Sequence, residues 1–212
     1  MREGAGVASA GPAGPARLVP GGPIHDPSGG ARPGGRRLRV DGPELTAHPQ
    51  KEVATPTGDS RLRARLAELG LRLHGPHPPH DPLDAVVVHG GQARTSGQLP
   101  RIDGELTCCG RLGDTVSLED GTEAAAVCAL NALAVLEVAL GSLDRVERVL
   151  TVTGYVASTP DFHRQPAVVD GASRILHQVF GDAGRHTRSA VGVAALPRGG
   201  AVEIEVTVAV RP

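Results

Sequence analysis

From residue 60 onward, the apolar residues follow helical and strand-like patterns in turn. Leucines recur at helical spacing in residues 60–73, with arginines around the rest of the helical wheel, which predicts a short amphipathic helix. Residues 83–100 predict two short strands joined at Gly90 and Gly91, a typical hairpin signal. A further turn is expected at residues 102–106.

Two longer helices with one strand between them come next. Ser117, with Asp120 three residues on, is a capping-box type start for an apolar helix that Gly141 ends. Residues 148–158 are rich in β-branched side chains and predict a strand. Residues 165–184 predict the second helix.

The last pattern, residues 186–210, predicts a β-hairpin that turns at Pro197–Gly200. The element order β–β–α–β–α–β–β then predicts an α+β fold with two helices on one face of a mixed β-sheet. Arg188 would lie in the first arm and Glu203 in the second, about 20 Å apart along the ribbon at ~3.3 Å per residue. The two side chains cannot meet within one simple hairpin. Either they are independent surface charges or another chain completes a site that they share.

Composition divides the chain into two parts. Residues 1–60 contain 12 Gly and 9 Pro and no aromatic residue, a composition typical of low-complexity, disordered chain. We therefore expect a disordered tail over residues 1–58 and one folded domain over residues 59–212. The whole chain has three aromatic residues, so the core must be filled by Val, Leu and Ala. A core this light, with one sheet face uncovered, suggests burial by self-association.

The net charge and the cysteine content limit the possible binding partners and the cellular compartment. A formal net charge of −1 gives no electrostatic reason to expect nucleic acid or acidic membranes as partners. The longest apolar stretch, residues 124–141, is interrupted by an asparagine and a glutamate and is interpreted as a core helix, not a membrane span. Cys108, Cys109 and Cys128 follow no Cys-x-x-Cys spacing and no secretory signal is evident, so we expect free thiols in a soluble, cytoplasmic protein.

Three histidines raise the question of a metal site. His74, His77 and His80 recur every three residues in the Pro-rich connector over residues 74–82. In a polyproline II segment they would stand about 9 Å apart, at ~3.1 Å per residue, whereas Zn–N bonds are only ~2.0–2.1 Å. We expect an exposed loop here and no metal.

Arg188 is the strongest candidate for a binding residue. Its planar guanidinium matches a carboxylate in a bidentate, charge-assisted pair. In strand periodicity Ala190 and Gly192 share its face, and such small neighbours leave room for a ligand. A salt bridge within an oligomer is the structural alternative.

Three stretches resemble the Rid family of reactive-intermediate deaminases, also known as YjgF/UK114 and often labelled endoribonuclease L-PSP. They are TSGQLP (95–100), LDRVERVLTVTGYVAS (143–158) and RSAVGVAALPRGGAVEIEV (188–206). The resemblance covers roughly residues 66–210 and implies a chorismate-mutase-like fold. It also implies a homotrimer in which the sheets form an inner barrel and the sites lie in clefts between subunits. The implied reaction is hydrolysis of 2-imino acids to 2-oxo acids and ammonia, with no cofactor.

By this resemblance Arg188 takes the position of the carboxylate-binding arginine and Glu203 that of the water-orienting acid. Ser96 and Gly97 take the positions of a Ser-Gly pair at the cleft. The implied mechanism has Arg188 clamp the carboxylate of a 2-imino acid while backbone groups near Gly97 and Ala190 contact the reacting end. Glu203 orients or deprotonates the water that attacks the imine carbon.

Three positions depart from the family pattern. Ala190 stands where the family often has Cys or Thr, and Leu83 stands where it usually has Tyr. The helix asparagine that often helps to hold substrate falls near Asp170 or Ser173. The clamp remains, but hydroxyl, thiol and amide donors are lost from the pocket.

The leading hypothesis is an enzyme, a trimeric imine deaminase. The alternative, which Leu83 and Ala190 favour, is a trimer that binds a small carboxylate metabolite or a partner without turnover. Ribonuclease activity, suggested by the older label, is the third. A chain with few aromatics and no His/Lys catalytic pair offers little to stack on bases or to hold phosphates.

Overall fold

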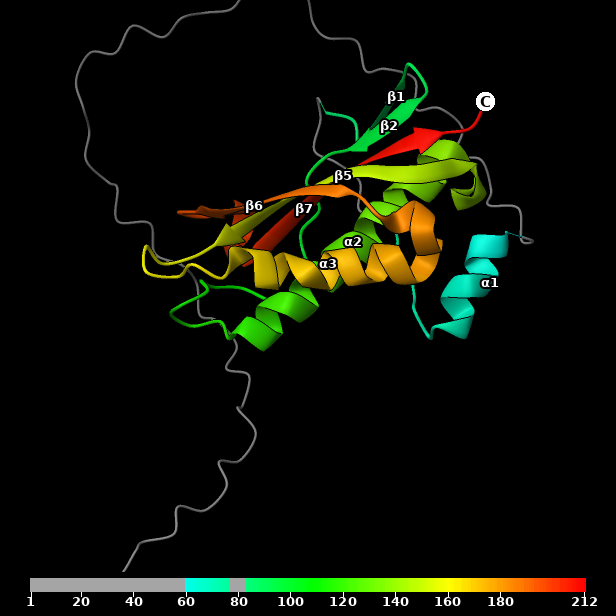
Figure 1. The fold of residues 1–212 in the computed structure, drawn as a ribbon. Coiled ribbons are helices and arrows are strands. Elements are labelled where there is room, and N and C mark those ends of the chain that lie inside the picture. The colour runs from blue at the N-terminus through cyan, green and yellow to red at the C-terminus, as the bar shows by residue number, and fades with distance from the viewer. Residues whose placement is uncertain (1–59, 77–82) are drawn as a thin grey trace, which may run out of the picture. The chain divides into compact units, whose positions relative to one another are not determined.

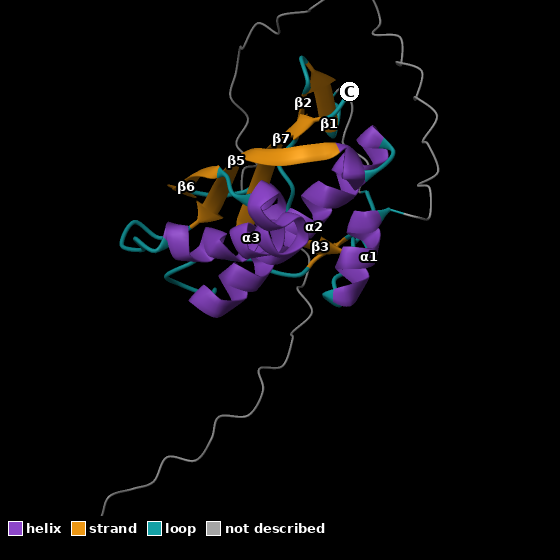
Figure 2. Ribbon diagram, turned by 45° about the vertical axis from the view of Figure 1, so that its right-hand side comes forward, coloured by secondary structure: helices purple, strands orange, loops and turns teal. Residues whose placement is uncertain are grey.

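The computed structural model describes residues 60–76 and 83–212. The tail expected over residues 1–58 and two connector histidines, His77 and His80, lie outside the described residues. Within these residues one five-stranded sheet carries two long helices on one face, as the α+β prediction requires (Figures 1 and 2). In spatial order the strands are β1 (Val86–His89), β2 (Gln92–Thr95), β7 (Val202–Val210), β5 (Val146–Ala157) and β6 (Thr187–Val193).

Short elements complete the chain. The predicted turn at residues 102–106 is a two-stranded ribbon in which Asp103 and Gly104 have positive φ. The remaining short elements are β3 (Arg101–Ile102), β4 (Glu105–Leu106) and the 3-10 turns η1 (Leu143–Arg145), η2 (Gly181–Gly184) and η3 (Pro197–Gly199).

The two C-terminal strands are not a hairpin. β5 lies between them, pairing in parallel with β6 and antiparallel with β7, so the predicted hairpin over residues 186–210 is wrong. The segment between the strands passes the end of β5, where Ser158 N donates to Val193 O and Ala157 N donates to Ala201 O. Period-two alternation reveals which face a residue occupies but not which strand lies beside it, so a buried central strand can intervene.

The first long helix, α2 (Leu118–Leu140), forms the centre of the core. Ser117 Oγ accepts a hydrogen bond from Asp120 N at 3.0 Å, and Gly141 ends the helix with φ 77°, as the capping signals predicted. The helix is long and apolar enough to cross a membrane, but 72% of that apolar window is buried inside the fold. It is a core helix, as expected, and packs against α3 and β7.

The second long helix, α3 (Gln165–Phe180), lies close to both α2 and the sheet. It ends at Gly181, and the last residues of the predicted range 165–184 form the 3-10 turn η2 instead. A Cβ on Gly154 of β5 would collide with the side chain of Val169, and a Cβ on Gly171 would strike the carbonyl oxygen of Thr122 on α2. Val, Leu and Ala dominate the buried core around these helices, as the composition predicted.

The N-terminal helix α1 (Arg61–Glu68) is shorter than predicted. It ends at Leu69, because Gly70 has φ 65° and turns the chain away before the last leucines of the pattern. Leu62 and Leu66 are buried, whereas the later leucines pack against the core from irregular chain.

Polar contacts fasten α1 to the rest of the fold. The Asp144 carboxylate accepts from the backbone N–H groups of Arg61 and Leu62, at 2.9 and 3.2 Å. Arg63 forms a two-pronged ion pair with Glu137 of α2, through Nε at 2.7 Å and through Nη2. The Glu137 side chain is only 5% exposed, so its carboxylate depends on this partner.

Replacing Arg63 tests that dependence. Arg63→Ala leaves the Glu137 carboxylate buried without its guanidinium, which is expected to cost about 1–3 kcal/mol of unfolding free energy. Equilibrium urea unfolding measures the loss. Arg72→Ala is the matched control, because its ion pair with Asp103 is exposed on both sides and is worth ~0–1 kcal/mol. Equal losses in the two variants would contradict a role for the buried carboxylate.

Candidate functional site

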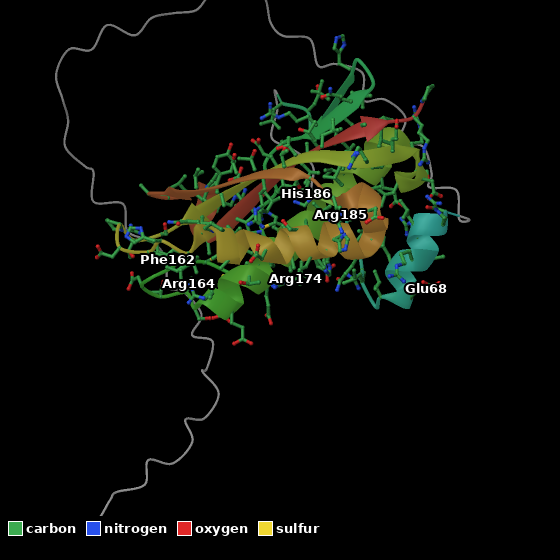
Figure 3. The ribbon with its side chains drawn as sticks, in the orientation of Figure 1. Glu68, Phe162, Arg164, Arg174, Arg185 and His186 are labelled. Carbon is green, nitrogen blue, oxygen red and sulfur yellow. The ribbon has the colours of Figure 1, made fainter. Side chains whose placement is uncertain are left out.

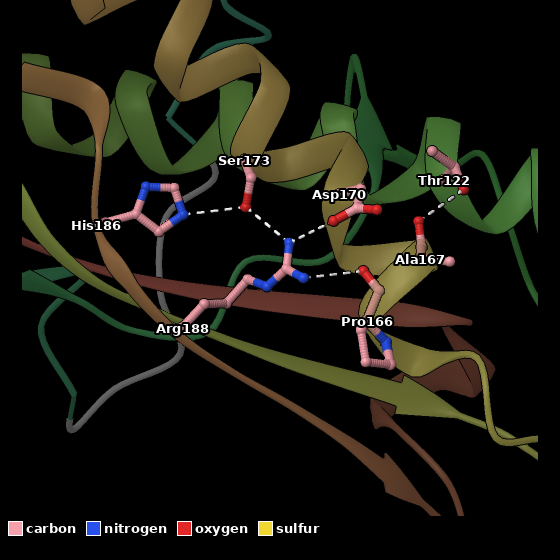
Figure 4. Close-up of polar contacts among 7 residues, drawn as sticks. All are labelled: Thr122, Pro166, Ala167, Asp170, Ser173, His186 and Arg188. Atoms are coloured by element: carbon pink, nitrogen blue, oxygen red, sulfur yellow. Dashed lines mark hydrogen bonds and ion pairs between the residues drawn. The ribbon is translucent and has the colours of Figure 1, made fainter. Parts of the chain in front are cut away.

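Arg188 reaches from β6 to the first turns of α3. Its Nη1 donates to Asp170 Oδ1 at 2.8 Å and to Ser173 Oγ at 3.0 Å, and its Nη2 donates to the carbonyl oxygen of Pro166 at 3.2 Å (Figure 4). Nη1 has two N–H groups, so both are used. Within the described residues, the Nε–H and the second Nη2–H have no protein partner. A ligand on this arginine must therefore bind its Nε–Nη2 edge.

The ion pair with Asp170 changes the charge of the predicted site. The Arg188 side chain is 22% exposed and that of Asp170 is 51% exposed, so the pair lies at the surface of the molecule beside α3. The structure thus brings Asp170 into an ion pair with Arg188. It also shows that the arginine's charge is balanced within the chain.

A chain of hydrogen bonds continues from Arg188 to His186. The His186 Nδ1 lies 2.6 Å from the carbonyl oxygen of Gly184, and its Nε2 lies 3.0 Å from Ser173 Oγ. A carbonyl only accepts, so this network assigns the proton to Nδ1, and Nε2 accepts from the Ser173 hydroxyl. The serine oxygen is thereby oriented to accept from Arg188 Nη1.

His186 belongs to no sequence motif, yet it takes part in this hydrogen-bond network. It lies where the chain enters β6 (Figure 3) and is half-buried. His163 and His177 are exposed. A signal was present in the spacing: His186 and Arg188 are two apart on one strand face, and Asp170 and Ser173 are three apart on one helix face.

Glu203 lies on the other face of the sheet. Val152 of β5 is in register with Arg188 on one side and with Val206 on the other, whereas Tyr155 is in register with Glu203. Residues in register share a face and successive residues alternate, so Arg188 faces the helices and Glu203 faces the helix-free side. One chain cannot bring the two together, as the sequence indicated, but the reason is the sheet itself and not distance along a hairpin.

Ser96 and Gly97 belong with Glu203. A Cβ on Gly97 would overlap the Glu203 carboxylate. The next residue, Gln98, exchanges two backbone hydrogen bonds with Ile204 at 2.9 and 3.0 Å, and its side-chain amide donates to Ser96 Oγ. The predicted site residues therefore form two clusters.

The Glu203 cluster consists of Ser96, Gly97 and Glu203. The Arg188 cluster consists of Arg188, Asp170, Ser173 and His186. Ala190 follows Arg188 on the same face of β6 and is partly buried against the core.

The Glu203 carboxyl has a perturbed pKa. Burial, and secondarily the nearby charge of Glu205, raise the pKa of Glu203 above its ordinary value. A half-buried carboxylate of this kind holds a proton more readily than one in water. The Glu203 cluster is thus able to accept a proton from a bound water.

Cys108 and Cys128 are not activated nucleophiles. Burial, Asp120 and Cys109 raise the pKa of Cys108 to about 11, and burial raises the pKa of Cys128 well above its ordinary value. Both groups remain protonated near neutral pH, and a thiol is a far weaker nucleophile than a thiolate. All three cysteines are free, as predicted.

Residues 60–76 and 83–212 offer little metal-ligand chemistry. No group of three His, Cys, Asp or Glu side chains in these residues could hold a metal ion. His74, the described member of the connector histidines, has a buried Nδ1 without a hydrogen-bond partner in the described part of the chain.

The chain belongs to the family described as "YjgF/chorismate_mutase-like, putative endoribonuclease", whose model matches residues 63–202. It is 42% identical over 149 residues to Protein TCP17 of Trypanosoma cruzi, which covers 70% of this chain and 93% of that protein. The match confirms the resemblance to the Rid, or YjgF, family and the chorismate-mutase-like fold.

Two solved structures share this fold. Atu1372 of Agrobacterium tumefaciens, a protein of unknown function, aligns with a TM-score of 0.65 and 37% identity, over 71% of this chain and 94% of that one. A protein from Shewanella oneidensis MR-1, titled a putative endoribonuclease, aligns with a TM-score of 0.69 and 28% identity, over 72% of this chain and 100% of that one.

The raised pKa of Glu203 predicts how the stability of the fold depends on pH. The folded chain binds this proton more tightly than the unfolded chain, so the unfolding free energy falls as pH rises from about 4.3 through the folded-state pKa. Glu203→Gln does not titrate. It is expected to be more stable than wild type near pH 7, and this advantage should shrink as the pH is lowered below about 5.

Urea unfolding at a series of pH values measures the difference. Glu105→Gln is the matched control, because Glu105 is an exposed carboxylate on the short strand β4 and its replacement should change stability little at any pH of the series. A Glu203→Gln effect that is the same at every pH would contradict the raised pKa.

Proposed function

We propose that this protein hydrolyses the imines of 2-amino acids to 2-oxo acids and ammonia, in a homotrimer whose sites lie between subunits. The observation that carries the proposal is the Glu203 carboxylate, half-buried, raised in pKa and placed against the open Cα of Gly97. A general base works best when its pKa is close to the working pH. Burial moves Glu203 in that direction.

The reaction requires one positioned substrate and one water. The Nε–Nη2 edge of Arg188 binds the substrate carboxylate. Glu203 takes a proton from a water while the water oxygen forms a bond to the imine carbon. A protonated imine thereby becomes a carbinolamine. Its nitrogen takes up the proton from Glu203 and leaves as ammonia, while the hydroxyl proton passes to Glu203 and the carbonyl of the 2-oxo acid forms. An imine is intrinsically reactive, so positioning and one base supply the catalysis needed.

A second copy of the chain would supply the missing half of each site. Within one chain the two clusters lie on opposite faces of the sheet. β6, which carries Arg188, is an edge strand, and its Val191 on the helix-free face is 42% exposed. An apolar, unpaired edge beside the Arg188 cluster is a suitable place for the Glu203 cluster of a neighbouring subunit.

Binding without turnover is the second candidate function, and specific observations favour it. Ala190 provides no hydroxyl or thiol beside Arg188, and Leu83 is 51% exposed and also lacks a hydroxyl. Asp170 already balances the charge of Arg188. A protein that binds 2-oxo acids but leaves the rate of imine decay unchanged would fit this candidate.

Arg188 is the residue to test first. Imines generated in situ by an amino-acid oxidase are the substrate, and ammonia release is the readout. Arg188→Ala is expected to lower kcat/KM by about 10- to 150-fold, corresponding to ~1.5–3 kcal/mol for hydrogen bonds to a charged group. Arg188→Lys should recover only part, because an ammonium cannot reproduce the fork.

Arg72→Ala is the control for loss of a surface arginine. Size-exclusion chromatography of each variant separates a binding defect from dissociation. Ammonia release by Arg188→Ala at the wild-type rate would show that this arginine does not hold the substrate.

Mixing two impaired variants tests whether the site is shared. If Arg188 of one subunit works with Glu203 of the next, trimers refolded from equal amounts of Arg188→Ala and Glu203→Gln regain roughly a quarter of the wild-type sites, since each mixed ring has one complete site. Neither variant alone regains activity. An inactive mixture of folded trimers would contradict a shared site.

A further inference from the structure

The hydroxyl group of Ser173 bonds outside its own helix. A serine inside an α-helix commonly donates to a carbonyl oxygen of the preceding turn, which turns its oxygen toward the helix backbone. Ser173 Oγ instead lies 3.0 Å from His186 Nε2, and it accepts from Arg188 Nη1 at 3.0 Å. His186 thus takes the hydroxyl proton away from the α3 backbone and leaves the serine oxygen to the arginine.

His186 is itself held from the other side. Its Nδ1–H donates to the carbonyl oxygen of Gly184 at 2.6 Å, which leaves Nε2 to accept from Ser173. Gly184 comes this close to α3 because it has no side chain, since a Cβ there would strike the carbonyl oxygen of Leu176. The turn η2 therefore packs against α3 closely enough to bring the imidazole to the serine.

We propose that Ser173 and His186 are positioning residues, which fix the guanidinium of Arg188 in the orientation that offers its Nε–Nη2 edge to a carboxylate. This inference rests on the proposed function, because it concerns how the same arginine holds the same ligand. Ser173 contacts the Nη1 side of the guanidinium, away from the ligand edge, and His186 joins the network only at Ser173 (Figure 4). Both residues therefore act through the arginine and not on the ligand.

Three acceptors on α3 determine the plane of the guanidinium. Asp170 and Ser173 each take one N–H of Nη1, and the carbonyl oxygen of Pro166 takes one N–H of Nη2. A carboxylate oxygen accepts hydrogen bonds over a broad range of directions, so Asp170 alone balances the charge without defining the plane. The second contact of Nη1, to Ser173, removes that freedom.

Preorganisation is what the ligand gains. An arginine side chain has many rotamers, and a ligand that binds a mobile arginine has to order it. In this chain the ordering takes place on folding. The network occupies both N–H groups of Nη1 and directs the remaining edge outward, where a carboxylate can accept two parallel hydrogen bonds.

A purely structural role for the network would be to fasten β6 to the rest of the fold. The strand does not depend on it, because β6 pairs with β5 along its whole length, from Thr187 to Val193. Ser173 and His186 are half-buried, so replacing them removes little packing from the core. Their contacts are spent on the arginine.

The first measurement is the affinity for 2-oxobutyrate, by titration calorimetry with the full chain at neutral pH. Ser173→Ala removes the hydroxyl, and His186→Asn keeps a donor near the position of Nδ1 but has no acceptor at the position of Nε2. Each is expected to weaken binding about 3- to 10-fold, the effect of one hydrogen bond. His186→Gln, whose side-chain oxygen reaches the position of Nε2, should keep most of the affinity.

The double variant Ser173→Ala/His186→Asn tests whether the histidine acts through the serine. In that case the second change adds nothing, and the double variant binds within about twofold of Ser173→Ala alone. In imine hydrolysis the same variants should raise KM and leave kcat nearly unchanged, because they weaken a contact that the substrate and the transition state share.

The second measurement needs no ligand. The Nε–H of Arg188 gives a signal in nitrogen–proton correlation spectra of the labelled full chain, and its absence in Arg188→Ala identifies it. Wild type and His186→Gln are expected to share one position of this signal. Ser173→Ala and His186→Asn should share another, closer to that of a solvated arginine, because the guanidinium is then free to turn.

His163→Asn is the matched control, since His163 is exposed, and it should equal wild type in both measurements. Urea unfolding of each variant shows whether the fold is retained. An unchanged affinity and an unchanged Arg188 signal in both Ser173→Ala and His186→Asn would overturn the proposal. A double variant whose loss of affinity is the product of the two single losses would overturn it as well.

The two measurements separate this inference from the proposed function. If the wild type hydrolyses no imine but the Arg188 signal changes as described, the proposed function fails and the positioning role stands. If imines are hydrolysed while Ser173→Ala and His186→Asn keep the wild-type KM and the wild-type signal, only the positioning role fails.

Discussion

The close approach of α3 to β5 and α2 is the constraint on which the Arg188 cluster depends. Gly154 and Gly171 make that approach possible, because a Cβ at either position would collide with Val169 or with the backbone of Thr122. Glycine inside a strand or a helix costs roughly 0.5–1 kcal/mol relative to alanine, so the fold gives up stability at both places. In return, the first turns of α3 lie within hydrogen-bonding reach of the side chain of Arg188.

The position of β5 between β6 and β7 determines how far apart the two clusters lie and what the helix-free face presents. β5 stands between the strands that carry Arg188 and Glu203, and the two clusters lie on opposite faces of the sheet. It also leaves a helix-free face on which Thr151, Thr153 and Glu205 are half-exposed. We expected self-association to bury apolar surface on the uncovered face, but this face carries polar side chains. The strongly exposed valines, Val87, Val88 and Val191, belong instead to β1 and β6, the two edge strands. Association that buries apolar surface must therefore involve the edges of the sheet.

Local signals in the sequence predicted the elements well because caps and turns are decided by neighbours. Ser117, Gly141 and the turn at Gly90 each behave as their chemistry requires. Strand neighbours could not be predicted in this way, since alternation is equally compatible with a hairpin and with an intervening strand. The same limit applies to the site. Arg188 was found from its own sequence context, but its ion pair depends on α3, 18 residues earlier, where only the spacing of Asp170 and Ser173 on one helix face indicates it.

The two candidate functions differ in what happens at the nitrogen end of the ligand. A carboxylate is unchanged by imine hydrolysis, so a residue that holds only the carboxylate binds substrate, transition state and product equally and does not accelerate the chemical step. Arg188 is therefore compatible with an enzyme and with a binding protein. In the proposed mechanism the changing bonds are met by Glu203, which accepts a proton of the attacking water. Under that mechanism, turnover requires the Glu203 carboxylate, on the helix-free face of one subunit, beside a ligand that is held by Arg188 of another.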